Sequence, residues 1–115
     1  MKKILLVDNH AGILRVLARE LEICGFEVIT ARNGEEALRT IYNGVPDLVL
    51  LDIMMPVMNG FEMLSELRKF SGLPVIADSF DECNKEQALK SGADDFILKP
   101  FETGVLLDKV RCLLS

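Results

Sequence analysis

The sequence has few cysteines and no long apolar run, and each shortage argues against a class of protein. Cys24, Cys83 and Cys112 are an odd number without metal-ligand spacing, which argues against a disulfide framework or a zinc site. We expect reduced thiols in a cytoplasmic protein, with Cys24 and Cys112 filling core positions in helices. The run Ile4–Val7 ends at Asp8, too early for a signal peptide, and no run is long enough to span a bilayer.

Positive charge is also scarce. Lys and Arg number 13 against 18 Asp and Glu, which gives a formal net charge of -5 at pH 7. This balance argues against nucleic acid or a membrane surface as a partner held by bulk charge. The chain has 115 residues, of which 50% are hydrophobic, and this suits one globular domain over 1–115.

Short apolar runs alternate with helical spacing of apolar residues along the whole chain. The runs predict strands at Ile4–Val7, Phe26–Ala31, Leu48–Leu51, Pro74–Ala77 and Phe96–Leu98. The spacing predicts helices at Ile13–Cys24, Asn33–Tyr42, Asn59–Leu67, Glu82–Lys90 and Val105–Leu114. The helix at Glu82–Lys90 has few apolar residues, so we expect it to be short and weakly held. Strict alternation predicts an α/β fold, a doubly wound sandwich with a parallel five-stranded sheet.

Polar side chains follow the predicted strands and should meet at one edge of the sheet, where ligands bind in such folds. Asp8 and Asn9 follow the first strand, Asp52 the third, Ser79 the fourth and Lys99 the fifth. Carboxylates, a hydroxyl and an ammonium at one edge suit a divalent cation and a phosphoryl group.

Simpler roles are open to some of these residues. Asp8 alone is compatible with a turn or cap residue, and Lys99 with a surface lysine at a strand end. Asp52 is harder to explain in this way, because it follows four apolar residues and no nearby partner offsets its desolvation.

Three blocks of sequence together resemble the receiver domain of bacterial two-component response regulators, the family of the chemotaxis regulator CheY. The blocks are Ile4–Asn9, Pro46–Gly60 and Gly92–Phe101. The resemblance covers essentially the whole chain, and implies a flavodoxin-like (βα)5 fold with the strand order 2-1-3-4-5.

The resemblance also implies roles for single residues. Asp52 would accept a phosphoryl group, Lys99 would pair with it, and Ser79 and Phe96 would act as switch residues. The peptide bond between Lys99 and Pro100 would be cis, so that Lys99 turns back toward Asp52.

A bound Mg²⁺ is part of the same expectation. Its ligands would be Asp8, Asn9, Asp52 and the backbone carbonyl of Met54. Asn9 stands where the family usually has an acidic ligand, and without that charge we expect weaker Mg²⁺ binding.

The family function is phosphoryl transfer from a sensor histidine kinase or phosphotransfer protein to the aspartate. The domain would not be an enzyme with its own substrate, although it assists its own phosphorylation and dephosphorylation. Its output face would be formed by Glu82–Lys90, Phe96–Leu98 and Val105–Leu114, and would bind a downstream protein or a second copy. No effector follows Leu114, so we expect a stand-alone or an excised receiver.

Two departures support a second hypothesis, a degenerate receiver that binds partners without phosphorylation. Asn9 replaces an acid, and Phe80 follows Ser79 where the family favours a small residue. The stretch from Ser79 to Gly92 is also shorter than is usual in the family.

An aspartyl-phosphate hydrolase is disfavoured, because Met54 stands where a second Asp would act as general acid. A flavin-binding protein is disfavoured because no Ser/Thr-rich loop follows the first strand.

Overall fold

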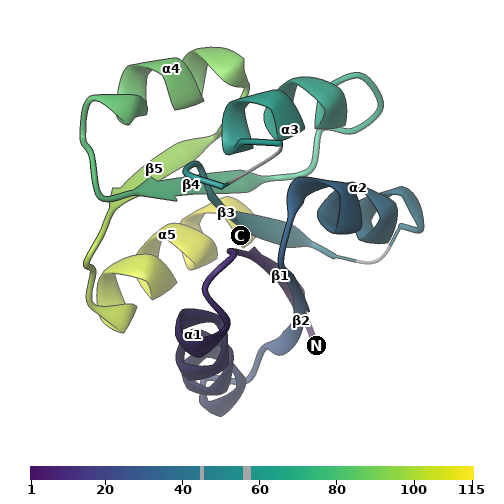
Figure 1. The fold of residues 1–115 in the computed structure, drawn as a ribbon. Coiled ribbons are helices and arrows are strands. Elements are labelled where there is room, and N and C mark those ends of the chain that lie inside the picture. Colours follow the sequence, from purple (N-terminus) through teal and green to yellow (C-terminus); the bar gives the residue numbers. More distant parts are fainter. Residues whose placement is uncertain (45, 56–57) are drawn as a thin grey trace.

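Five parallel strands form one sheet between two layers of helices (Figure 1). The structure is a computed structural model that describes residues 1–44, 46–55 and 58–115, so Pro56 and Val57 of the second motif block lie outside the described residues. The strands are β1 Lys3–Val7, β2 Glu27–Ala31, β3 Leu48–Asp52, β4 Val75–Ser79 and β5 Asp95–Leu98. The helices are α1 Ala11–Ile23, α2 Gly34–Tyr42, α3 Gly60–Leu67, α4 Asn84–Ser91 and α5 Thr103–Leu114.

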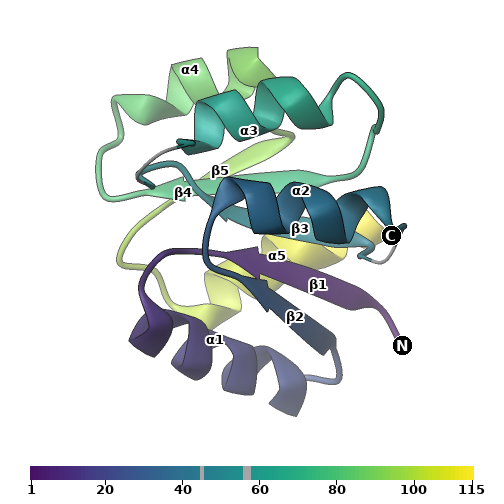
Figure 2. The ribbon, with the colours of Figure 1, turned by 45° about the vertical axis from the view of Figure 1, so that its right-hand side comes forward.

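The order of the strands across the sheet is β2-β1-β3-β4-β5, which confirms the predicted fold. All four strand pairings are parallel, and the carboxyl ends of the strands therefore share one edge (Figure 2). Helices α1 and α5 cover one face of the sheet, and α2, α3 and α4 cover the other. Side chains alternate between two separate apolar cores because successive residues of a strand point to opposite faces.

The helix starts follow the sequence signals. The side chain of Asn33 accepts the Glu36 N–H and caps α2. Asn59 and Glu62 form a complete capping box at the start of α3. These caps satisfy N–H groups that the helix itself leaves without partners.

Several predicted burials are wrong. Cys24, Cys83 and Cys112 are all exposed, so none of the thiols fills the core. Cys24 lies just beyond α1, and Cys112 lies on the side of α5 opposite to the buried Val110. The spacing of Ala37, Leu38, Ile41 and Tyr42 predicts that they share the apolar face of α2, but Tyr42, the last residue of the helix, is exposed whereas Ile41 is buried.

The spacing of Ile13, Val16, Leu17, Leu21 and Cys24 predicts that they form the apolar face of α1, but of these only Leu21 is buried. Leu14 and Leu21 are buried, whereas Ile13 and Val16 are exposed. Both sets fit helical spacing, so the sequence pattern alone does not distinguish the face that meets the sheet. Helix α4 is short as predicted, with Ala88 as its buried residue.

Strand β4 extends beyond its predicted end. It reaches Ser79, and all its residues are buried, including Asp78. Hydrogen bonding to β3 and β5 continues through this polar end, because Asp52 is in register with Asp78 and Ser79 with Leu98. The peptide bond between Lys99 and Pro100 is cis, as predicted.

Gly60 allows α3 to begin directly against the end of β3. A Cβ atom at this position would lie 2.6 Å from the Cα of Ile53 and 3.0 Å from the carbonyl oxygen of Asp52. The Gly60 N–H also donates to the Ile53 carbonyl at 2.9 Å. The backbone directly after Asp52 is therefore held by a close contact that only glycine permits.

Replacing Gly60 by alanine should destabilise the domain by about 1–3 kcal/mol, because backbone atoms have to move to admit the new methyl group. The measurement is urea unfolding followed by circular dichroism. Gly104→Ala is the matched control, since a Cβ at Gly104 in α5 meets no atom within 4 Å. Equal stability of the two variants would contradict the proposed close approach.

Candidate functional site

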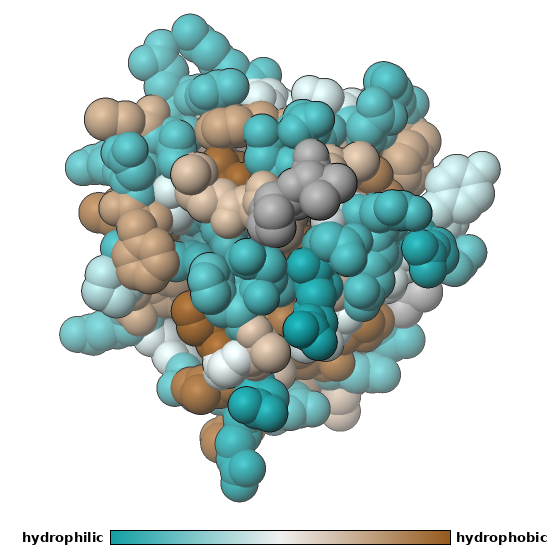
Figure 3. Space-filling model, in the orientation of Figure 1, coloured by the Kyte–Doolittle hydropathy of each residue, from teal (hydrophilic) through white to brown (hydrophobic). Residues whose placement is uncertain are grey.

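The carboxyl edge of the sheet brings together the side chains predicted to form the site. Asp8 follows β1, Asp52 ends β3, Ser79 ends β4 and Lys99 follows β5. All four are buried, although each has a polar or charged side chain. The face that carries this edge is hydrophilic over most of its centre, with apolar patches beside it (Figure 3).

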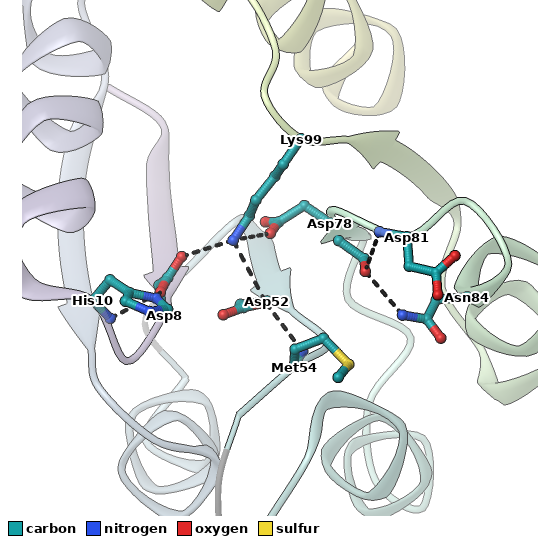
Figure 4. Close-up of polar contacts among 9 residues, drawn as sticks. Asp8, His10, Asp52, Met54, Asp78, Asp81, Asn84 and Lys99 are labelled. Carbon is teal, nitrogen blue, oxygen red and sulfur yellow. Dashed lines mark hydrogen bonds and ion pairs between the residues drawn. The ribbon is translucent and has the colours of Figure 1, made fainter.

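The Lys99 ammonium lies among three carboxylates (Figure 4). Its Nζ is 2.9 Å from Asp78 Oδ1, 3.1 Å from Asp8 Oδ2 and 3.5 Å from Asp52 Oδ1. The side chain of Lys99 is only 7% exposed, so these contacts lie largely outside solvent screening. Three acids around one ammonium leave an excess of negative charge when all of them are ionised.

Asp78 is the residue that the sequence reasoning missed. With β4 predicted to end at Ala77, Asp78 appeared to be a loop residue ahead of Ser79. The available signal was an acidic residue directly after an apolar run, the same signal that singled out Asp52. In the structure Asp78 is 3% exposed and lies closest to Lys99 of the three carboxylates.

Burial and neighbouring charges shift the pKa values of Lys99 and of the three carboxylates around it. Burial raises the pKa of Asp52, and repulsion from Asp8 adds to the effect. Burial also raises the pKa of Asp78, to about 7. For Lys99, burial alone would lower the pKa, but the charges of Asp78, Asp52 and Asp8 outweigh it and hold the pKa above its usual value. Burial would likewise raise the pKa of Asp8, but hydrogen bonds from His10 and the charge of Lys99 keep it low.

Oxygen and nitrogen ligands for a cation also lie beside Asp52. Asp8, His10 and Asp52 each offer one ligand atom, and these atoms lie within 4.8 Å of one another. The Asn9 Oδ1 is buried and accepts no hydrogen bond from the described residues. His10 was not predicted, although it is the only histidine and follows Asp8 by two positions. Its Nδ1 lies 3.0 Å from Asp8 Oδ1.

Ser79 is tied to the start of α4. Its Oγ accepts the Asp81 N–H at 3.0 Å and the Asn84 side-chain amide at 2.9 Å. Phe96, the other expected switch residue, is only 6% exposed and belongs to the core beneath α3 and α4. A switch residue of this kind would be expected to move inward on phosphorylation, but Phe96 is already buried in this structure.

Two further residues border Asp52 and Lys99. The Met54 N–H donates to Asp52 Oδ1 at 3.0 Å, and the Met54 side chain is exposed. The Phe80 ring lies over Lys99, with Nζ 5.3 Å from the ring centroid, a cation–π contact. Phe80 is 64% exposed, so it covers Lys99 from the solvent side.

Comparisons with known proteins agree with this geometry. The family model described as "Response regulator receiver domain" matches residues 4–111. A probable transcriptional regulator ycf27 of Pyropia yezoensis is 44% identical over 98% of this chain and 47% of its own length. A CpxR homolog of Haemophilus influenzae is 41% identical over 99% of this chain and 51% of its own length. The chain thus spans about half the length of the curated relatives it matches.

Solved structures give the same result. The response regulator protein TrrA from Thermotoga maritima, in complex with Mg²⁺-BeF, is 38% identical with a TM-score of 0.92, covering 99% of this chain and 100% of that one. The Francisella response regulator 1452 receiver domain is 34% identical with a TM-score of 0.92, over 99% and 97%. None of the described helices combines the length and the apolar character that crossing a membrane requires.

The raised pKa of Asp78 predicts a pH-dependent stability. Between its ordinary value of 3.8 and about 7, the folded domain keeps a proton on Asp78 that the unfolded chain has lost. The free energy of unfolding contributed by Asp78 therefore falls as the pH rises through this interval.

The test is urea unfolding of the wild type and of Asp78→Asn between pH 4 and pH 8. The wild type should lose stability relative to the variant as the pH rises, because Asn keeps the neutral form at every pH. A constant difference between the two proteins would show that Asp78 titrates normally.

Proposed function

Because the chain belongs to the family of response regulator receiver domains, we propose that it is a signalling module switched by phosphorylation of Asp52. The observation that supports this most directly is the buried Asp52 carboxylate, 3.5 Å from the Lys99 ammonium at the carboxyl edge of the sheet. The phosphoryl donor is the phosphohistidine of a sensor kinase or of a phosphotransfer protein. An oxygen of Asp52 forms the new bond to phosphorus as the bond from phosphorus to the histidine nitrogen breaks.

The chain's own residues prepare Asp52 for this transfer. The Met54 N–H holds one carboxylate oxygen, Oδ1, at 3.0 Å, and thereby orients the group. Lys99 carries a positive charge because its pKa is raised, and it partly offsets the burial that raises the pKa of Asp52. The same ammonium is near enough to pair with the negative charge that arrives with the phosphoryl group.

The residues around Asp52 fit Mg²⁺. Asp8, Asp52 and the orphaned Oδ1 of Asn9 supply oxygen atoms, the ligand type that Mg²⁺ prefers, and the backbone carbonyl of Met54 is a further candidate. When bound, Mg²⁺ neutralises phosphoryl oxygens. It would also balance the excess of carboxylates over ammonium groups.

The switch proposed here starts at Ser79. The Ser79 Oγ accepts hydrogen bonds from Asp81 and Asn84, so a movement of Oγ that lets its own O–H donate to a phosphoryl group on Asp52 strains both of these bonds. Asn84 is the first residue of α4, a helix with Ala88 as its buried residue, so little apolar packing opposes its movement. A change at Ser79 therefore reaches the surface formed by α4, β5 and α5, where a downstream protein or a second copy would bind.

The proposal makes the domain a phosphoacceptor and not an enzyme with its own substrate. Two of its relatives are described as transcriptional regulators about twice as long as this chain. Any DNA binding would belong to sequence outside the receiver domain, and the net charge of -5 agrees with this.

A second candidate function, partner binding without phosphorylation, is favoured by Asn9 and Phe80. Asn9 brings no charge to the cation site, and the ring of Phe80 covers Lys99. The burial of Asp8, Asp52 and Lys99 favours the phosphorylation switch over this alternative. Burying charged groups costs free energy, and partner binding alone would not require it.

Asp52→Asn should abolish phosphorylation by acetyl phosphate in the presence of Mg²⁺, since the amide is no acceptor. Intact-protein mass spectrometry measures the added phosphoryl group. Asp108→Asn, at an exposed position of α5, removes the same charge and should leave incorporation at the wild-type level. A label retained in Asp52→Asn would disprove the assignment, and an unlabelled wild type would favour the second candidate function.

Asn9→Asp should tighten Mg²⁺ binding by about tenfold, because a carboxylate adds an attractive charge that solvent only partly screens. It should also lower the stability of the Mg²⁺-free domain, since it adds repulsion near Asp8 and Asp52. Calorimetric titration measures the affinity, and urea unfolding the stability. Unchanged affinity would show that residue 9 does not contribute to the cation site.

A further inference from the structure

Asp78 differs from the other two carboxylates in its position around Lys99. It lies on β4 among residues that line a cleft of about 790 Å³ beside α1 and the start of α5. Strand pairing fixes its backbone, since the Ile53 N–H donates to the Asp78 carbonyl at 3.0 Å. Figure 4 shows Lys99 extending between Asp78 and Asp8, with Asp52 beneath them.

We propose that Asp78 is a positioning residue that holds the Lys99 ammonium away from Asp52 and so limits how readily a phosphoryl group on Asp52 acquires this cation. The inference rests on the proposed function, and it assigns Asp78 a part in the site for which no role was expected.

The distances support a competition for one charge. Nζ lies 2.9 Å from Asp78 Oδ1 as an ion pair, donates a hydrogen bond to Asp8 Oδ2 at 3.1 Å, and is 3.5 Å from Asp52 Oδ1. Lysine has a single compact charge, so the contact with Asp78 limits how closely the ammonium approaches Asp52. A phosphoryl group on Asp52 has to draw Lys99 from a buried ion pair, which is harder to loosen than an exposed one.

Competition between Asp78 and a phosphoryl group for Lys99 predicts opposite effects on the affinities for beryllofluoride and for Mg²⁺. With Asp78 neutral, Lys99 moves toward Asp52 and Asp8, where it meets an incoming phosphoryl group but repels a cation. Asp78→Asn should therefore bind beryllofluoride more tightly and Mg²⁺ alone more weakly. A purely structural role for Asp78 would weaken both or change neither.

The experiment measures both affinities for the wild type and Asp78→Asn at pH 8, where Asp78 is largely ionised because its pKa is about 7. Beryllofluoride, with saturating Mg²⁺, should bind the variant about five- to tenfold more tightly, the size expected for one partly screened charge contact. Mg²⁺ alone should bind it about two- to fivefold more weakly for the same reason. Asp108→Asn controls for the loss of one negative charge elsewhere on the surface and should change neither affinity.

A double-mutant cycle tests whether Asp78 acts through Lys99. In a Lys99→Gln background, Asp78→Asn should no longer tighten beryllofluoride binding, because the Lys99 ammonium for which Asp78 competes is absent. The proposal is overturned if the gain persists in that background, or if both affinities of Asp78→Asn change in the same direction.

A crystal structure of ligand-free Asp78→Asn provides a measurement that does not depend on phosphorylation. Nζ of Lys99 should lie closer to Asp52 Oδ1 than the present 3.5 Å. If Nζ stays beside residue 78, Asp78 does not set its position and the proposal is wrong. A wild type that fails to bind beryllofluoride would disprove the proposed function, and the position of Lys99 in the variant would still decide the role of Asp78.

Discussion

The arrangement of the carboxyl edge depends on one ion-pair cluster, the Lys99 ammonium among the carboxylates of Asp8, Asp52 and Asp78. Each acid comes from a different strand, so the ammonium joins the ends of β1, β3 and β4 to the end of β5. No acid of the cluster is isolated in the apolar interior, where an unpaired charge would be too costly to keep. The perturbed pKa values of these groups follow from this shared contact.

The sheet determines which groups meet in that cluster. Strand order β2-β1-β3-β4-β5 places β1 and β3 next to each other at the centre, with β4 and β5 beyond them. Gly60 then brings α3 against the backbone of β3 directly after Asp52. Strand pairing and this close backbone contact bring the polar groups to one edge, and the ion pairs with Lys99 then position their side chains.

The fold and most of the site were predictable because both follow from regular patterns. Alternation of apolar runs and helical spacing determines the order of elements, and polar residues after buried strands indicate the edge where they meet. Strand ends were less predictable, because β4 continues by pairing its backbone with β3 and β5 even where its side chains become polar. Asp78 was missed for this reason.

Other errors have a different cause. The exposed thiols and Tyr42 lie at helix ends or on the far side of a helix, and apolar character alone does not reveal that position. His10 was missed because its contact with Asp8 at the possible cation site depends on the direction of the chain after β1, which local composition does not specify. The competition for Lys99 depends on the difference between its distances to Asp78, 2.9 Å, and to Asp52, 3.5 Å, and no sequence pattern specifies so small a difference.

The cluster also makes the site depend on both ends of the chain. Asp8 and Lys99 are separated by 91 positions, so the contact closes a loop that includes almost the entire domain. A chain still lacking β5 holds its acidic strand ends without their shared cation, and like charges then oppose close packing of the central strands. Completion of β5 relieves that repulsion. The site at the carboxyl edge is therefore complete only when β5 is paired in the sheet.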